Sequence, residues 1–130
     1  MTCCNQYCAA EKQFDDKKAE SDLQRYRRRG PDAVTQLMLV ELRRWPLHGE
    51  ALLDVGSGIG VIGAELADSG LVSATLVDAS SAYLHVARAE IESRYESRPT
   101  RFLLRRLCRD RGYSDRCRCG DAQPRRLLLP

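Results

Sequence analysis

The stretch Leu52–Gly60, "LLDVGSGIG", decides the fold. It continues a short apolar run, Ala51–Val55, of the kind found in strands buried on both faces of a parallel sheet. Glycines then occupy alternate positions from Gly56 to Gly60, where a tight turn and a close approach of backbone need residues without a Cβ atom. We therefore predict a strand, a glycine-rich loop and a helix whose N-terminus offers unpaired N–H groups to negative charge.

Working outward from this stretch, strands and helices continue to alternate. A helix over 61–69, closed by Gly70, leads to a second strand, Ser73–Asp78. A third strand opens at Arg101–Leu104. Between them, a helix starting at Ser80 or Ser81 carries its apolar side chains on one face. These are Leu84, Ala87, Ile91 and Tyr95. The order β-α-β-α-β predicts an α/β fold with right-handed crossovers and a parallel sheet.

Two helices are expected before the first strand. The earlier one, Glu11–Arg29, is charged and sparsely apolar, and Gly30-Pro31 ends it. Asp32 caps the later one, and Pro46 ends it. Apolar residues recur along this later helix at a spacing that predicts one buried stripe. The residues of the stripe are Val34, Leu37, Met38, Leu42 and Trp45.

An acidic residue, Asp78, follows Gly56 by 22 positions and ends the second strand. A carboxylate there can accept hydrogen bonds from both hydroxyls of a ribose lying across the sheet edge. Two cofactors fit the loop. The NAD pattern G-x-G-x-x-G matches Gly58, Gly60 and Gly63, but it starts three residues after the expected strand end. The pattern D-x-G-x-G-x-G starts where the strand ends, at Asp54.

In this second register, "LLDVGSGIG" and "LVDASSAYLHVARAE" resemble the first motif and the following strand and helix of class I S-adenosylmethionine-dependent methyltransferases. The resemblance runs from about Gly30 to Leu104. It implies the N-terminal half of a Rossmann-like methyltransferase fold, with S-adenosyl-L-methionine as cofactor. The amino-terminal residues are also loosely similar to a bacterial group named for magnesium-protoporphyrin methyltransferase.

The resemblance also implies a role for each matching residue. Asp54 lies near the methionine end of the cofactor, and Asp78 holds the ribose hydroxyls. Ala79 and Ser80 lie beside the adenosine. The loop beneath the cofactor consists of Gly56, Ser57, Gly58 and Gly60. The catalytic residues and the small-molecule methyl acceptor cannot be read from the sequence.

Composition divides the chain into two parts. Residues 1–100 carry 12 basic and 15 acidic side chains, whereas residues 101–130 carry 9 arginines and 3 aspartates. No apolar run approaches the ~20 residues that span a membrane, and the amino terminus lacks the features of a secretory signal. We expect a cytoplasmic protein with reduced thiols and no metal site. Free thiols are the favoured interpretation of Cys3, Cys4 and Cys8, because a zinc site usually has paired ligands.

The basic tail, residues 105–130, shows no hydrophobic period and interrupts the sheet pattern. A nucleic-acid arm and a metal site built on Cys108, Cys117 and Cys119 are open alternatives. A third alternative is a single-base frameshift after Leu104. Permitted codons for Arg105–Asp110, read one base later, encode Gly-Asp-Phe-Ala-Val-Thr, and those for Arg116–Pro130 encode a peptide with a buried-strand pattern. Both peptides resemble later methyltransferase segments, so we favour out-of-frame sequence and expect no nucleic-acid partner.

The sequence thus predicts a helical lead-in (1–30), an S-adenosylmethionine-binding half-domain (31–104) and an irregular tail (105–130). We expect a methyltransferase whose second half, including the acceptor site, is missing. Weak or absent activity, marginal stability and an uncovered sheet face follow from that expectation. An NAD(P)-dependent oxidoreductase fragment and a non-enzymatic nucleic-acid-binding module are the alternative functions.

Overall fold

The computed structural model describes residue 9 and residues 12–104. The predicted tail, 105–130, and all six cysteines lie outside these residues. The elements are α2 (Asp16–Arg29), α3 (Ala33–Leu42), β1 (Ala51–Val55), α4 (Val61–Glu65), the 3-10 helix η1 (Ala67–Ser69), β2 (Ser73–Asp78), α5 (Ser81–Tyr95) and β3 (Thr100–Leu104). The predicted α/β order is confirmed, with the expected helix over 61–69 divided into α4 and η1.

Local capping explains where the longer helices begin and end. The Asp15 carboxylate accepts a hydrogen bond from the Lys18 N–H at 2.9 Å, and Asp32 accepts one from Thr35 at 2.8 Å. These side chains satisfy N–H groups that have no partner within the first turn. Gly30 ends α2 with a φ of +74°, a conformation that favours glycine. No helix among the described residues is both long and apolar enough to cross a membrane.

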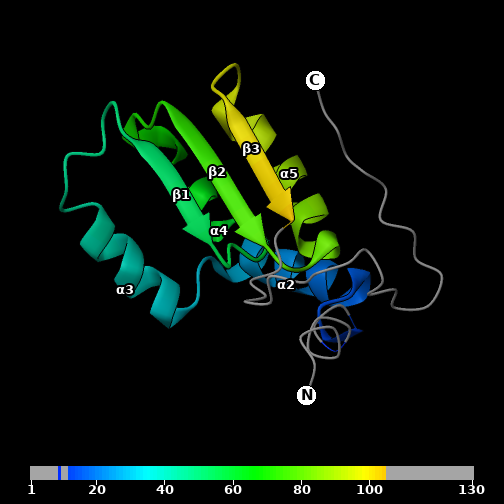
Figure 1. Cartoon of the computed structure of the whole chain (residues 1–130). Coiled ribbons are helices and arrows are strands. Elements are labelled where there is room, and N and C mark those ends of the chain that lie inside the picture. The colour runs from blue at the N-terminus through cyan, green and yellow to red at the C-terminus, as the bar shows by residue number, and fades with distance from the viewer. Residues whose placement is uncertain (1–8, 10–11, 105–130) are drawn as a thin grey trace, which may run out of the picture.

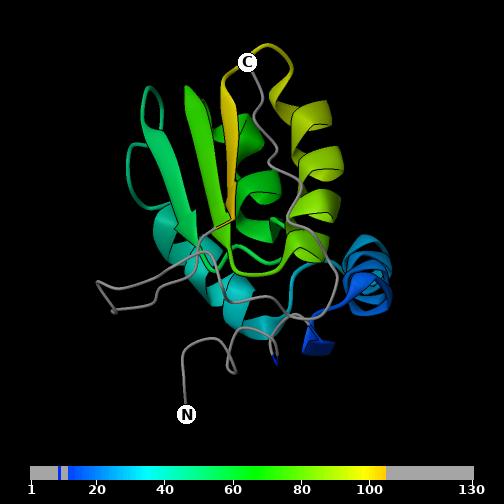
Figure 2. The same ribbon diagram turned by 45° about the vertical axis from the view of Figure 1, so that its right-hand side comes forward.

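The three strands form a parallel sheet in the order β1-β2-β3. Asp54 is paired with Leu76, and Val77 is paired with Leu103. Since the strands are parallel and in register, their carboxyl ends meet at one edge of the sheet. α4 and α5 lie against one face, and α2 lies beside α5 near that edge (Figures 1 and 2).

The core lies between the sheet and α5. Leu76 of β2 is fully buried, as are Ala87, Ile91 and Tyr95. The predicted apolar face of this helix is therefore confirmed. α2 adds to the same core through Ala19, Leu23 and Tyr26. The helical lead-in thus shares its packing with the sheet-containing part of the chain.

The second face of the sheet is open in the part of the chain that the structure describes (Figure 2). Leu53 and Val55 on β1 remain 65% and 60% exposed. Leu103 on β3 adds a further exposed apolar side chain. The expectation of an uncovered face is confirmed for the described residues.

The buried stripe predicted for the second helix is wrong. Val34, Leu37 and Trp45 are each about 70% exposed, and Met38 is 47% exposed. α3 lies beside β1 (Figure 1) and packs on α4, and its buried side chain is Leu39, with Leu42 partly covered. The periodicity marked an apolar helix surface correctly. However, no described element lies over that surface, so the stripe is not core.

Candidate functional site

The predicted site residues gather at the carboxyl edge of the sheet. β1 delivers Asp54 and then turns at Gly56, while β2 ends at Asp78. The structure therefore brings the acidic pair and the glycine loop together.

The Asp78 carboxylate accepts hydrogen bonds from two segments, the glycine loop and the start of α5. One oxygen accepts a hydrogen bond from the Gly58 N–H and the other accepts one from the Ser80 N–H, both at 2.8 Å. The glycine loop and the start of α5 are thereby held on either side of the end of β2. A carboxylate has about four lone-pair positions, so these two bonds leave acceptor capacity for ligand hydroxyls.

The loop amides are directed into the protein. The N–H groups of Gly56 and Ser57 donate to the Val77 carbonyl at 2.8 and 3.1 Å, and the Gly60 N–H donates to Ser57 at 2.9 Å. The Gly58 amide also has a partner, because it donates to Asp78. The unpaired N–H groups expected at the start of the following helix, α4 (Val61–Glu65), stay a prediction. The turn folds back over β2 immediately after β1, so a carbonyl of β2 accepts the hydrogen bonds of the Gly56 and Ser57 amides.

Two glycines are required for different reasons. Gly56 has a φ of +78°, and a Cβ atom there would meet nothing within 4 Å, so the space above it is free for a ligand. Gly60 has a φ of +81°, and its Cβ would lie 3.1 Å from Leu76 and 3.2 Å from Ala87. The loop can approach the core at Gly60 only because no side chain is present.

Burial and the nearby Asp78 carboxylate raise the pKa of Asp54 above its ordinary value. Three positions later in the chain, the buried Ser57 hydroxyl oxygen has no hydrogen-bond partner among the described residues. A buried polar atom without a partner is uncommon, and an acidic group with a raised pKa in a site is a frequent mark of function. Both features lie on residues predicted to surround a cofactor.

The two residues after Asp78 differ in burial and in hydrogen bonding. Ala79 is half-buried, whereas Ser80 is only 2% exposed. The Ser80 hydroxyl donates to the Phe14 carbonyl at 2.7 Å and accepts from the Tyr83 N–H at 3.3 Å. Its side chain therefore caps α5 and anchors the segment before α2. The backbone N–H and carbonyl of Ser80 also have partners, the Asp78 carboxylate and the Leu84 N–H.

Sequence reasoning missed three residues at this edge. Tyr83 on α5 lies beneath the glycine loop, and its hydroxyl donates to Asp22 on α2 at 2.5 Å. The Phe14 ring meets the Tyr83 ring edge-on, with centroids 5.5 Å apart. Tyr83 could have been noticed as an aromatic residue in the first turn after Ser80. No local signal pairs it with Asp22, 61 positions earlier.

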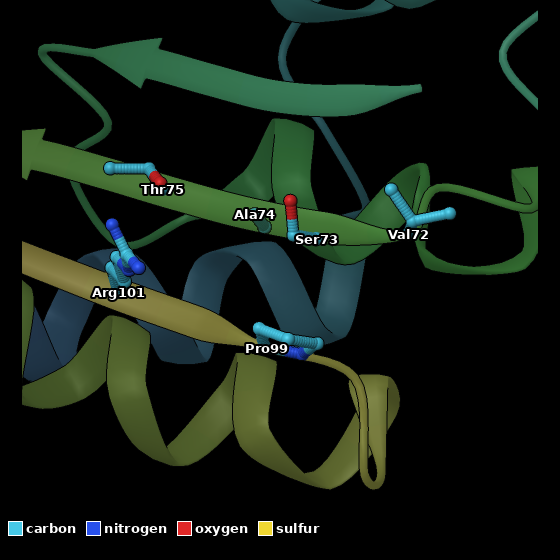
Figure 3. A pocket seen from close by; sticks show the side chains of 6 residues that line it. All are labelled: Val72, Ser73, Ala74, Thr75, Pro99 and Arg101. Carbon is cyan, nitrogen blue, oxygen red and sulfur yellow. The ribbon is translucent and has the colours of Figure 1, made fainter. Parts of the chain in front are cut away.

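A separate hollow of about 480 Å³ lies on the open face of the sheet (Figure 3). Its lining residues are Val72, Ser73, Ala74, Thr75, Pro99 and Arg101. They belong to the amino ends of β2 and β3, so the hollow is at the opposite end of the sheet from Asp54 and Asp78. No group of three or more potential metal ligands was found among the described residues.

A family model, the methyltransferase small domain, matches residues 21–106. The chain belongs to this family. No curated protein and no solved structure matches the chain. The family match includes the loop that starts at Gly56 and the acidic residue Asp78, together with every other residue predicted for the site. It supports the methyltransferase register of the loop over the NAD register.

The match to the methyltransferase small domain also covers most of α2, although this helix begins before the first matched residue. On this helix, Arg27 donates to the buried Glu90 carboxylate of α5 at 2.8 Å. Arg28 donates to the backbone carbonyl of Gln24. Arg27 therefore joins the end of α2 to α5, whereas Arg28 bonds within its own helix.

Proposed function

We propose that this chain binds S-adenosyl-L-methionine and serves as the cofactor-binding part of a methyltransferase with a small-molecule acceptor. The proposal rests mainly on one observation: Asp78 ends β2 and is bonded to Gly58 of the glycine loop. A ribose lying across this edge would have its two hydroxyls at the Asp78 carboxylate. Membership of the methyltransferase small domain family supports the same assignment.

The residues present fit this cofactor chemically. S-adenosylmethionine carries a sulfonium, an amino group and a ribose diol, all of which suit acidic or acceptor groups. Asp54 and Asp78 supply carboxylates, and the partnerless Ser57 hydroxyl supplies a further polar atom. The open space above Gly56 leaves room for the ligand near the backbone.

The loop suits a dinucleotide less well. A pyrophosphate is usually held by backbone N–H groups of the glycine loop and the helix after it. In the NAD register, which runs from Gly58 to Gly63, the N–H groups of Gly58 and Gly60 already donate to Asp78 and Ser57. These contacts support S-adenosylmethionine over NAD as the ligand.

The bound cofactor supplies an electrophilic methyl group to a nucleophile. In this proposal Asp78 fixes the ribose, Asp54 lies near the methionine end, and the loop from Gly56 to Gly60 supports the ligand from below. Orientation of the two reactants supplies much of the rate in such a transfer, and a base is needed only when the acceptor carries a proton.

Binding of S-adenosylhomocysteine tests the proposal. We expect it to raise the melting temperature of the protein, whereas NADH should leave it unchanged, because only a ligand that prefers the folded state stabilises it. Asp78→Asn should weaken binding roughly 10- to 100-fold through loss of charge-assisted hydrogen bonds. Asp68→Asn removes an exposed acidic group from η1 and is the matched control. Stabilisation by NADH alone would contradict the proposal.

We also propose that residues from Arg105 onward are read out of frame. The family match ends at residue 106, close to the predicted shift after Leu104. The nucleotide sequence provides the test: its next frame should encode Gly-Asp-Phe-Ala-Val-Thr at this point. Purified protein should then transfer tritiated methyl groups weakly or not at all. Codons that encode no such segment, or transfer at an ordinary rate, would refute this proposal.

A further inference from the structure

The amino-terminal helix α2 is fixed to the rest of the protein at three places. Asp22 accepts a hydrogen bond from Tyr83 at 2.5 Å, and Tyr26 donates to Glu65 of α4 at 2.8 Å. Arg27 completes the set by pairing with Glu90 at 2.8 Å. Of these three contacts, the one made by Tyr83 also reaches the glycine loop.

Tyr83 connects α2 to the loop through its ring. The side chain is 7% exposed, and a Cβ atom built on Gly58 would lie 3.6 Å from its ring carbon Cδ1. The ring therefore supports the backbone at Gly58, the residue whose N–H donates to Asp78. At its other end, the hydroxyl is held by the Asp22 carboxylate, which Lys18 also contacts.

The segment before α2 contacts the same edge of the sheet through Phe14. Phe14 places its ring edge-on against Tyr83, and its carbonyl accepts the hydroxyl hydrogen bond from Ser80. Ser80 follows Asp78 by two residues, and its N–H donates to that carboxylate. Both partners of Asp78 are thus supported by contacts that lead to residues 14–22.

We infer that Tyr83 is a positioning residue for the cofactor loop, and that docking of α2 and occupancy of the site favour each other. This inference rests on the proposed function. The path runs from Asp22 through the Tyr83 ring to Gly58, and from there to Asp78. Since coupling between two binding events is reciprocal, a ligand held by Asp78 and the loop also strengthens the attachment of α2.

Two tyrosine variants separate positioning from simple stabilisation. Tyr83→Phe keeps the ring beneath Gly58 but releases Asp22. Tyr26→Phe removes a comparable hydrogen bond that anchors the same helix to α4. Both should lower resistance to urea by similar amounts. Only Tyr83→Phe should weaken S-adenosylhomocysteine binding in calorimetry, on the order of tenfold.

Two further variants test the partner residue. Asp22→Asn keeps an oxygen that can accept the Tyr83 hydroxyl, and it should bind S-adenosylhomocysteine much like the unmodified protein. Asp22→Ala lacks that acceptor and should bind like Tyr83→Phe. Equal weakening in Asp22→Asn and Asp22→Ala would mean that binding depends on the charge of Asp22 and not on its hydrogen bond with Tyr83. This result would overturn the inference.

Hydrogen exchange supplies a readout that a purely structural role would not move. S-adenosylhomocysteine should slow exchange across α2 in the unmodified protein and should do so less in Tyr83→Phe. α3, which packs on α4 rather than on Tyr83, is the internal control. If the unmodified protein binds the ligand but Tyr83→Phe and Tyr26→Phe bind it equally well, the inference alone fails. If the unmodified protein binds no S-adenosylhomocysteine, the proposed function fails and the inference falls with it.

Discussion

Asp54 lies where the ionised form of its carboxyl is disfavoured. Its carboxyl is half-buried, and burial together with the Asp78 charge raises its pKa. A raised pKa means that the fold disfavours the ionised form, so the contribution of Asp54 to stability is fully present below the ordinary pKa of 3.8 and is lost as pH rises through the raised value. A carboxyl whose ionised form is disfavoured by its surroundings is common at functional sites.

Asp54→Asn tests whether the Asp54 carboxyl lowers stability while it favours ligand binding. The substitution replaces a carboxyl whose ionisation the fold disfavours with a neutral amide, so we expect the free energy of unfolding at pH 7 to rise by roughly 0.5–1 kcal/mol. Affinity for S-adenosylhomocysteine should fall in the same variant. Urea unfolding and calorimetry measure the two quantities. A variant that is less stable at pH 7 would show that Asp54 is stabilised by contacts that its raised pKa does not indicate.

At the scale of single elements, the interface between α2 and α5 is centred on a buried carboxylate. Glu90 is 7% exposed and accepts hydrogen bonds from Arg27 and from Arg94, the latter at 2.7 Å. Burial raises the pKa of Glu90, but the hydrogen bonds from the two arginines outweigh it and hold the pKa below its ordinary value of 4.5. The stabilisation is therefore present above pH 4.5 and is lost as pH falls through the lowered value.

Glu90→Gln should remove this acid dependence. We expect the variant to lose roughly 1–2 kcal/mol of unfolding free energy at pH 7, because charge-assisted hydrogen bonds are replaced by neutral ones. The difference from the unmodified protein should shrink as the pH is lowered below 4.5. Urea unfolding at several pH values gives the comparison, with the exposed Glu92→Gln as control. A difference that stays constant with pH would contradict the assignment.

The elements themselves were largely predictable, because their signals are local. Asp32 and Ser80 cap helices as expected, and the apolar face that ends at Tyr95 is buried. The stripe on α3 could not be judged in the same way. Helical periodicity shows that Leu37 and Met38 share a surface, but burial depends on what the rest of the chain places over it. For the same reason, contacts between distant positions such as Asp22 and Tyr83 were not predictable.

The site was predictable to a similar extent. Spacing alone placed Asp78 beside the glycine loop, since parallel strands end at one edge of the sheet. The partners of these hydrogen bonds could not be predicted from the sequence. The Gly56 and Ser57 amides donate to Val77, and the Ser80 hydroxyl donates to Phe14. Whether Ala79 and Ser80 lie beside an adenosine stays a prediction.

At the scale of the whole molecule, one sheet face is packed and the other is open in the described residues. Leu76 faces the packed side and is fully buried, whereas Leu53 on β1 is 65% exposed. Contiguous exposed apolar surface is typical of interaction sites or of proteins prone to association. Leucines of the same sheet should therefore respond very differently to substitution.

Leu53→Lys should change the free energy of unfolding by no more than about 0.5 kcal/mol, as expected for an exposed site. Leu76→Ala should cost about 2–5 kcal/mol through lost burial and a cavity. Urea denaturation of both variants, at two protein concentrations, makes the comparison. A large loss in Leu53→Lys would show that the face is covered in solution. Dependence of that loss on concentration would identify a second copy as the cover.

The strand order has a consequence for how the polypeptide assembles during synthesis. In the order β1-β2-β3, each strand pairs with the strand that precedes it in the chain. Each newly made strand can therefore pair with the strand before it, whereas α2 has to wait for α5, because Tyr83 and Glu90 lie more than 60 positions after Asp22 and Arg27. Parallel strands pair more slowly than helices form, because the connection between two paired strands has to close first. The sheet, the loop and the acidic edge all consist of residues before position 105, so the ribosome delivers all of them before the last 26 residues.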